Sequence, residues 1–234
     1  MKTKDLAFAG LLLLLFVPFG LSEWLLQAYQ IANKEHGMLM SFIKFAILAT
    51  TGEALGLRIK TGEYWYKGFG LLPRAIVWGF LGLTIKLAFV VFTKGTIGFL
   101  SFLGFENALE AFVGPLTSSK IVVAFSISAC MNLIYAPVMM TLHKITDTHI
   151  VTNGGTVSCL VKPINFDGIL SKIDWNIQWN FVFKKTIPFF WIPAHTITFL
   201  LPEEYQVLFA ALLGIALGVI LALAGIMSKN TRSK

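Results

Sequence analysis

Long apolar runs separated by short polar stretches make up most of the chain. The runs approach the roughly 20 residues needed to cross the hydrocarbon core of a bilayer, and they cover residues 6–26, 38–57, 76–92, 121–142 and 205–227. A sixth stretch, 175–201, is aromatic but contains Lys184, Lys185, Pro188 and Pro193, which is typical of a broken or partly interfacial segment. We therefore predict an all-α fold, a polytopic transmembrane helix bundle of about six membrane segments.

The polar stretch after the fourth run follows a different pattern. Residues 148–161 are rich in β-prone side chains and surround Asn153-Gly154, a dipeptide that often closes a two-residue hairpin. We predict a small extramembrane β-hairpin within a cytoplasmic-side loop over residues 144–172. No polar block is long enough for a separate domain, so residues 1–234 are expected to form a single transmembrane domain.

Composition supports lipid as the solvent of this fold. Hydrophobic residues make up 56% of the chain and charged residues 13%, about half the charged fraction of an average soluble domain. The net charge of +7 is expected to face an anionic membrane surface. No soluble segment contains a basic cluster interleaved with aromatic residues, so nucleic acid is not an expected partner. The expected partners are the lipid bilayer and small ions or metabolites, and no cofactor is expected.

The distribution of basic residues predicts the orientation. Six crossings with both termini in the cytoplasm leave only Lys34, Lys94 and Lys120 outside, whereas most other lysines and arginines collect inside. This asymmetry obeys the positive-inside rule. The short loops and the lack of an organelle-type targeting segment suit a bacterial plasma membrane, so we expect an integral membrane protein there.

Three charged side chains fall within the apolar runs, where charges are costly and usually face a partner or a cavity. They are Lys44, Glu53 and Lys86. Lys44 lies about two and a half helical turns before Glu53, on a nearly opposite face. We therefore expect Glu53 to pair with Lys86 or with Arg74. Such a pair either locks two helices together or lines a route for ions or small solutes.

Uncharged polar groups at membrane depth form a second set, Asn132, His195 and Thr198. Groups of this kind usually form hydrogen bonds between helices, and the alternative is that they line a pore.

Imidazole and carboxylate side chains at the end of the fourth run raise a metal hypothesis. His143, Asp147 and His149 follow a His-x3-Asp-x-His spacing, and His195 adds a fourth ligand type. Zinc and other transition metals prefer such groups. The simpler interpretation is that His143 ends a helix and Asp147 begins the predicted hairpin.

An ordered set of short motifs resembles the peroxisomal 22-kDa membrane protein family, to which the Mpv proteins of mitochondria belong. Trp191, His195, Thr198-Phe199 and Pro202 resemble its W-x3-Q-x2-N-F-x3-P signature, with His and Thr in place of Gln and Asn. Further similarities are Ala136-Pro137 for its Ala-Pro, Gly52-Glu53 for its Gly-Asp, and Arg74 with Gly79 for its R-x4-G. The family's G-P-x2-H-x-W-Y block is absent here, so the chain resembles a divergent, bacterial-like member. The resemblance implies a small multi-helix protein with channel-like activity.

Three hypotheses follow. The first is a channel or facilitator, monomeric or homo-oligomeric, whose polar route involves Glu53, Lys86, Arg74, Asn132, His195 and Thr198. The second is a membrane scaffold or assembly protein that conducts nothing. The third is a metal-dependent membrane enzyme or carrier that uses His143, Asp147, His149 and His195. Enzyme chemistry has the least support, because the chain has no phosphate-binding loop or nucleophile elbow.

Overall fold

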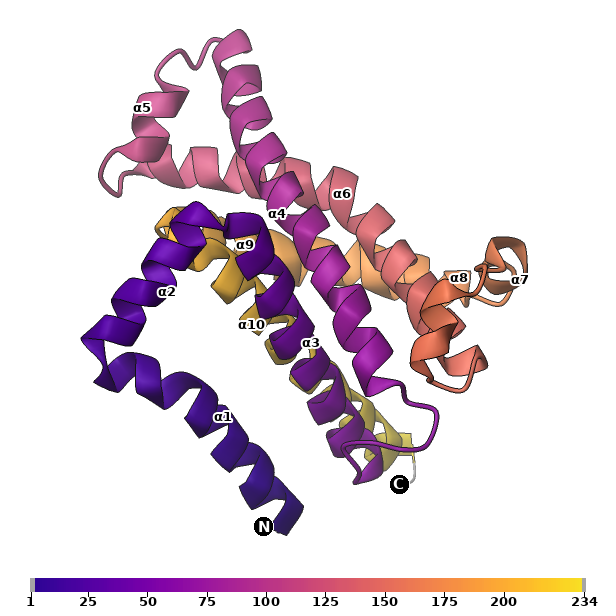
Figure 1. Cartoon of the computed structure of the whole chain (residues 1–234). Coiled ribbons are helices and arrows are strands. Elements are labelled where there is room, and N and C mark those ends of the chain that lie inside the picture. Colours follow the sequence, from indigo (N-terminus) through magenta and orange to yellow (C-terminus); the bar gives the residue numbers. More distant parts are fainter. Residues whose placement is uncertain (1–2, 233–234) are drawn as a thin grey trace. The chain divides into compact units, whose positions relative to one another are not determined.

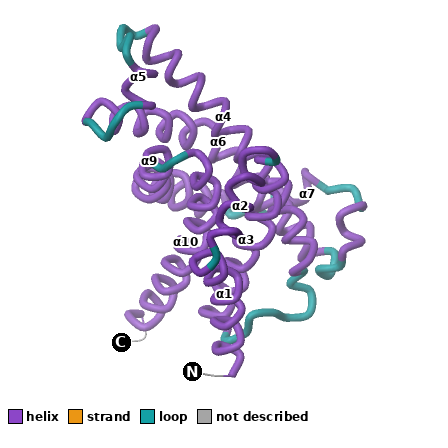
Figure 2. The backbone as a smooth tube through the Cα atoms, turned by 60° about the vertical axis from the view of Figure 1, so that its left-hand side comes forward, coloured by secondary structure: helices purple, strands orange, loops and turns teal. Residues whose placement is uncertain are grey.

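The computed structural model describes the backbone of residues 3–232 and the side chains of residues 3–219. The predicted cytoplasmic ends, residues 1–2 and 233–234, lie outside this part. Helices and the loops between them account for the described residues (Figure 2). The chain divides into two compact units, Met1–Met40 and Ser41–Lys234, and each is described by itself.

The first unit contains α1 (Thr3–Leu21) and α2 (Glu23–Glu35), followed by the first residues of α3 (Gly37–Thr61). We predicted one membrane segment over residues 6–26, whereas the structure has two helices joined at Ser22. The Ser22 hydroxyl accepts a hydrogen bond from the Leu25 N–H at 3.3 Å, so it caps the start of α2. The rings of Phe19 and Tyr29 lie 5.6 Å apart across this joint.

Three long helices form the centre of the second unit: α3, α4 (Leu71–Phe102) and α6 (Ser118–Thr152) (Figure 1). α3 and α4 run antiparallel, because Gly82 packs on Ser41 and Trp78 bonds to Glu53. A Cβ atom at Gly82 would lie 2.7 Å from the carbonyl oxygen of Ser41, so the two backbones touch there. α4 and α6 are also antiparallel, since Thr84 is hydrogen-bonded to Tyr135 and Arg74 forms an ion pair with Asp147.

The connection between α4 and α6 contains a short helix, α5 (Ala108–Val113). The final helix, α10 (Glu203–Arg232), runs parallel to α3 (Figure 1). Added Cβ atoms at Gly52 and Gly56 would approach Ile215 and Gly218 respectively, at 3.0 Å and 3.8 Å. The second unit therefore has one end at which α3, α6 and α10 finish and α4 begins. Its neighbouring loops and helix ends carry Arg58, Lys60, Lys67, Lys144 and Lys162, and we call it the basic end.

The predicted β-hairpin within residues 144–172 is wrong. Residues 144–152 continue α6, and Gly154 and Gly155 end that helix with φ values of +72° and +66°. The Gly155 N–H bonds to the Ile150 carbonyl at 2.9 Å, as in a helix C-terminal cap. Glycine at positive φ suits this cap as well as a hairpin turn, so the Asn-Gly signal did not distinguish them. Short helices follow instead of strands: η1 (Val157–Val161), α7 (Phe166–Leu170) and α8 (Trp175–Ile177).

The aromatic stretch is continuous helix with two geometries. Over η2 (Gln178–Trp191) it is a π-helix, and its wide turns end where the Ile192 N–H bonds to the Ile187 carbonyl five residues back. Pro188 lies inside this segment, and an irregular helix of this kind accommodates its missing N–H. α9 (Ile192–Leu200) then begins with Pro193 in its first turn, a favourable position for proline.

Four helices in the described part are long and apolar enough to cross a membrane: α1, α3, α4 and α6. Helices of this length and composition are typical of an integral membrane protein. The predicted count of about six membrane segments is wrong for the described residues. The two extra segments were inferred from the stretches that form the η2–α9 helix and α10. Our last predicted segment covers residues 205–227, and the side chains of α10 beyond residue 219 lie outside the described part.

Candidate functional site

Four ionisable side chains from α3, α4 and α6 meet near the basic end. They are Glu53, Arg74, His143 and Asp147, and we call them the charged cluster. Arg74 stands in the first turn of α4, Glu53 about two turns before the end of α3, and His143 about two and a half turns before the end of α6. The cluster therefore lies inside the helix bundle, beneath the loops of its basic end.

Arg74 is the centre of the cluster and the most buried of its members, with 7% of its side chain exposed. Its Nη1 pairs with Glu53 and its Nη2 with Asp147, while its Nε donates to the Phe69 carbonyl at 2.6 Å. The guanidinium also lies over the Phe69 ring, 4.4 Å from the centroid. One planar guanidinium group thus connects α3, α6 and the loop that precedes α4. A lysine, with a single nitrogen, cannot reach all three partners in this way.

Glu53 accepts hydrogen bonds from a second direction. Its Oε1 lies 2.7 Å from Trp78 Nε1 and 2.9 Å from His143 Nε2. The Trp78 ring lies against His143, with centroids 4.4 Å apart, and stacks on Phe45 from α3. The carboxylate is therefore oriented by an indole, an imidazole and a guanidinium, while an aromatic wall covers one side of the site.

Local sequence spacing explains these alignments. Arg74 and Trp78 are four residues apart on α4, and His143 and Asp147 four apart on α6, so each pair shares a helix face. Close packing of the preceding loop sets the register of α4 against α6. A Cβ atom on Gly155 would lie 2.5 Å from the Gly68 carbonyl oxygen, so the end of α6 touches the loop that leads into Arg74.

The cluster is accessible and its charges do not balance. Glu53, Asp147 and His143 keep 19%, 24% and 28% of their side chains exposed. Two carboxylates face one guanidinium, which leaves one negative charge in excess while the imidazole is neutral. A proton on His143 or a bound cation would neutralise that excess.

Asn132, His195 and Thr198 lie in a separate polar group between α6 and α9. The Asn132 amide and His195 Nδ1 are within hydrogen-bonding distance, at 3.0–3.1 Å. Ser128 Oγ donates to the Ile192 carbonyl at 2.7 Å, and Thr198 Oγ1 donates to Ala194 within its own helix. All of these side chains are buried. The hydrogen bonds of Ser128 and Asn132 hold α9 against α6.

Lys86 lies away from the charged cluster. It pairs with Glu203 at the start of α10, at 2.8 Å, and stands about 18 Å along α4 from Arg74. The partner of Glu53 is therefore Arg74 and not Lys86. Lys44 is buried in α3, more than two turns from Glu53.

The predicted metal ligands do not converge. His149 is buried and its Nε2 lies 2.9 Å from the Cys159 carbonyl oxygen, whereas His195 belongs to the group with Asn132. Among residues whose placement is described, no set of three or more His, Cys, Asp or Glu side chains could hold a metal ion. His143 and Asp147 instead belong to the charged cluster. We did not predict from the sequence that His143 and Asp147 meet Glu53 and Arg74. We also did not include Trp78, for which the only indication in the sequence is its position one helical turn after Arg74.

Comparison with known proteins adds no relative: no family model matches the chain, and no curated protein or solved structure is significantly similar to it.

Proposed function

We propose that the protein is a membrane channel or facilitator for ions or small polar metabolites, and that the permeating species meets the charged cluster. One observation carries this proposal. Three helices that could each cross a membrane bring Glu53, Arg74, His143 and Asp147 together in a partly exposed site. Ionisable groups at such positions are costly, and they commonly mark the pathway of an ion or a substrate.

The charge imbalance favours this function over a purely structural one. A scaffold needs only to neutralise and seal its buried charges, and one carboxylate would suffice for Arg74. Here Asp147 adds a second carboxylate that remains about a quarter exposed. The excess negative charge favours cations, or solutes with a cationic group, over anions.

The resemblance proposed from the sequence agrees with this choice of site. Two positions of that ordered set, Glu53 and Arg74, are direct partners in the charged cluster. We propose that the chain is a divergent member of the peroxisomal 22-kDa family in a bacterial plasma membrane, with its basic end toward the cytoplasm as the positive-inside rule requires.

Flux into liposomes tests the proposal. The purified full chain is reconstituted, and uptake of potassium, chloride and small organic solutes is compared with that of empty vesicles. Glu53→Gln removes one carboxylate charge from the cluster, and Glu204→Gln makes the same change at an exposed position at the start of α10. We expect wild-type flux with a preference for cations, a large loss for Glu53→Gln, and no change for Glu204→Gln.

Two outcomes would contradict the proposal. Wild-type protein that is inserted and monodisperse but gives no flux above empty vesicles would favour the scaffold. Normal flux and selectivity in Glu53→Gln would remove the cluster from the route. Circular dichroism and monodisperse elution of each variant separate a lost function from a lost fold.

A further inference from the structure

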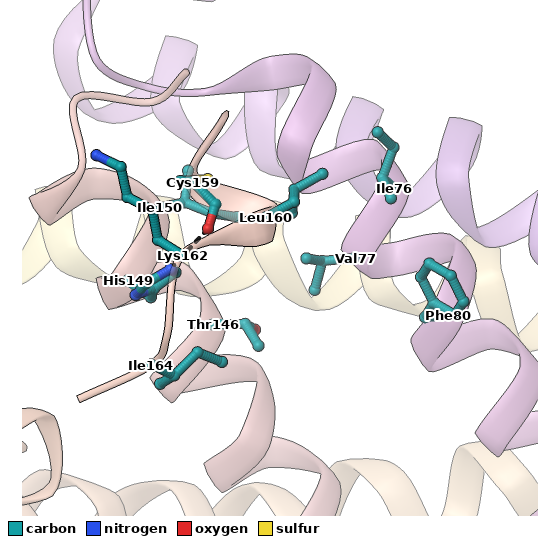
Figure 3. Close-up of a pocket in the computed structure, with 10 residues that line it drawn as sticks. All are labelled: Ile76, Val77, Phe80, Thr146, His149, Ile150, Cys159, Leu160, Lys162 and Ile164. Carbon is teal, nitrogen blue, oxygen red and sulfur yellow. Dashed lines mark hydrogen bonds between the residues drawn. The ribbon is translucent and has the colours of Figure 1, made fainter. Parts of the chain in front are cut away.

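An apolar pocket of about 220 Å³ lies between α4, the last turns of α6 and the segment around η1 (Figure 3). Ile76, Val77 and Phe80 form its α4 wall, and Ile150 and Leu160 line the opposite side. Neither the charged cluster nor the group around His195 contributes to it. The pocket is thus a separate feature of the basic end.

The polar side chains in its walls are already engaged. His149 Nε2 lies 2.9 Å from the Cys159 carbonyl oxygen (Figure 3), and Thr146 Oγ1 donates to Leu142 and His143 carbonyls at 3.1 Å and 2.9 Å. An occupant therefore meets mostly carbon atoms. Water or a small polar solute would find few hydrogen-bonding partners, whereas a hydrocarbon chain would find a matching surface.

Two features of the surroundings specify the kind of hydrocarbon. The α4 wall belongs to a helix that could cross a membrane, and Phe80 is 60% exposed on it, so this wall continues toward acyl chains. Lys162 contributes to the rim and is exposed, with its Nζ 3.2 Å from Asn153 Oδ1. An apolar pocket beside an exposed ammonium group is complementary to an amphiphile with a negative head group.

We propose that this pocket binds one acyl chain of an anionic phospholipid and that Lys162 contacts its phosphate. The chain end lies against Val77 and Phe80, and the head group remains at the basic end, where phospholipid phosphates are found. This binding does not depend on conduction, so it stands or falls separately from the proposed channel.

Photocrosslinking in vesicles tests the site. The full chain is reconstituted in phosphatidylcholine containing phosphatidylglycerol that carries a diazirine at the end of one acyl chain, and crosslinked peptides are mapped by mass spectrometry. We expect saturable labelling of residues 76–80 and 157–164 that excess unlabelled phosphatidylglycerol suppresses. The same diazirine on phosphatidylcholine should label these residues several times less.

Matched variants separate a pocket from general lipid contact. Val77→Trp fills the pocket, and Val91→Trp adds the same bulk on α4 at a position 53% exposed that does not line it. Labelling of 157–164 should disappear in the first variant and persist in the second. Lys162→Gln should weaken the preference for phosphatidylglycerol about fivefold, since one lysine near an anionic surface contributes about 1 kcal/mol, and exposed Lys172→Gln should leave it unchanged.

Several results would overturn the proposal. Non-saturable labelling, or labelling spread evenly along α4, would mean ordinary boundary lipid. Equal labelling by phosphatidylglycerol and phosphatidylcholine would show that Lys162 does not select an anionic head group. If Val77→Trp fails to fold, competition in the wild-type protein still decides the matter. Unlabelled phosphatidylglycerol then replaces phosphatidylcholine while the fraction of labelled lipid stays constant, and under these conditions only labelling at a site decreases.

Discussion

The substitution Arg74→Lys separates the shape of the guanidinium from its charge. Arg74 uses Nη1 for Glu53, Nη2 for Asp147 and Nε for the Phe69 carbonyl. A lysine keeps the positive charge but offers one nitrogen on a flexible stem, so it can satisfy one of these partners well. At least one hydrogen bond of a charged group, and with it a second hydrogen bond or the ion pair with Asp147, is then lost or weakened.

The expected magnitude follows from these lost contacts. Hydrogen bonds involving a charged group contribute about 1.5–3 kcal/mol each in soluble proteins, and hydrogen bonds between membrane helices average less, about 0.6 kcal/mol. Because Arg74 is 7% exposed and its partners are partly solvated, we expect the free energy of unfolding to fall by about 2–3 kcal/mol. Arg74→Gln also removes the charge that two carboxylates face, so we expect a loss of about 3–5 kcal/mol.

Reversible unfolding in mixed micelles, with sodium dodecyl sulphate as denaturant and tryptophan fluorescence as the signal, measures these losses. Lys144→Gln is the control, because it removes a positive charge from an exposed position next to His143 and should change stability by less than about 0.5 kcal/mol. If Arg74→Lys unfolds like the wild type, or if Lys144→Gln is as damaging, then the three-way contact of Arg74 does not stabilise the fold.

Two further predictions compare glycines in the same measurement. Gly82→Ala places a Cβ atom 2.7 Å from the Ser41 carbonyl oxygen, whereas Gly95→Ala on the same helix meets nothing within 4 Å; the first should lose about 1–3 kcal/mol by overpacking and the second should be neutral or slightly stabilised. Gly155→Ala combines a φ of +66° with a contact of 2.5 Å to the Gly68 carbonyl oxygen, whereas Gly154→Ala has only its φ of +72°. Gly154→Ala should therefore lose about 1–2 kcal/mol and Gly155→Ala clearly more, and equal losses would show that the loop does not press on the end of α6.

The apolar runs located the long helices, but they did not give their lengths. α6 continues for nine residues beyond our predicted end at His143 and passes through Pro137. Its last turns contain Lys144, Asp147 and Thr148, and Asn153 follows as its C-cap, side chains that are equally common in a loop. Those turns are held by packing of the 68–70 loop on Gly155 and by the Arg74–Asp147 pair, contacts between residues far apart in the sequence.

The charged cluster was predicted in two halves. Glu53 was expected to pair with Arg74 or Lys86, while His143 and Asp147 were assigned to a metal hypothesis with His149 and His195. Each half followed from residue type and local spacing. Their union depends on the register between α3, α4 and α6, which is set by backbone contacts such as Gly82 on Ser41 and leaves no local signal in any one helix.

The parallel arrangement of α3 and α10 fixes a relation between distant parts of the chain. If α3 traverses the bilayer, α10 runs beside it toward the same side, so a reporter fused after α10 and a label in the 62–70 loop must reach the same compartment. The two reporters must agree whichever way the protein is inserted. A reporter at the carboxyl terminus is therefore enough to show which side of the membrane the charged cluster is nearer to.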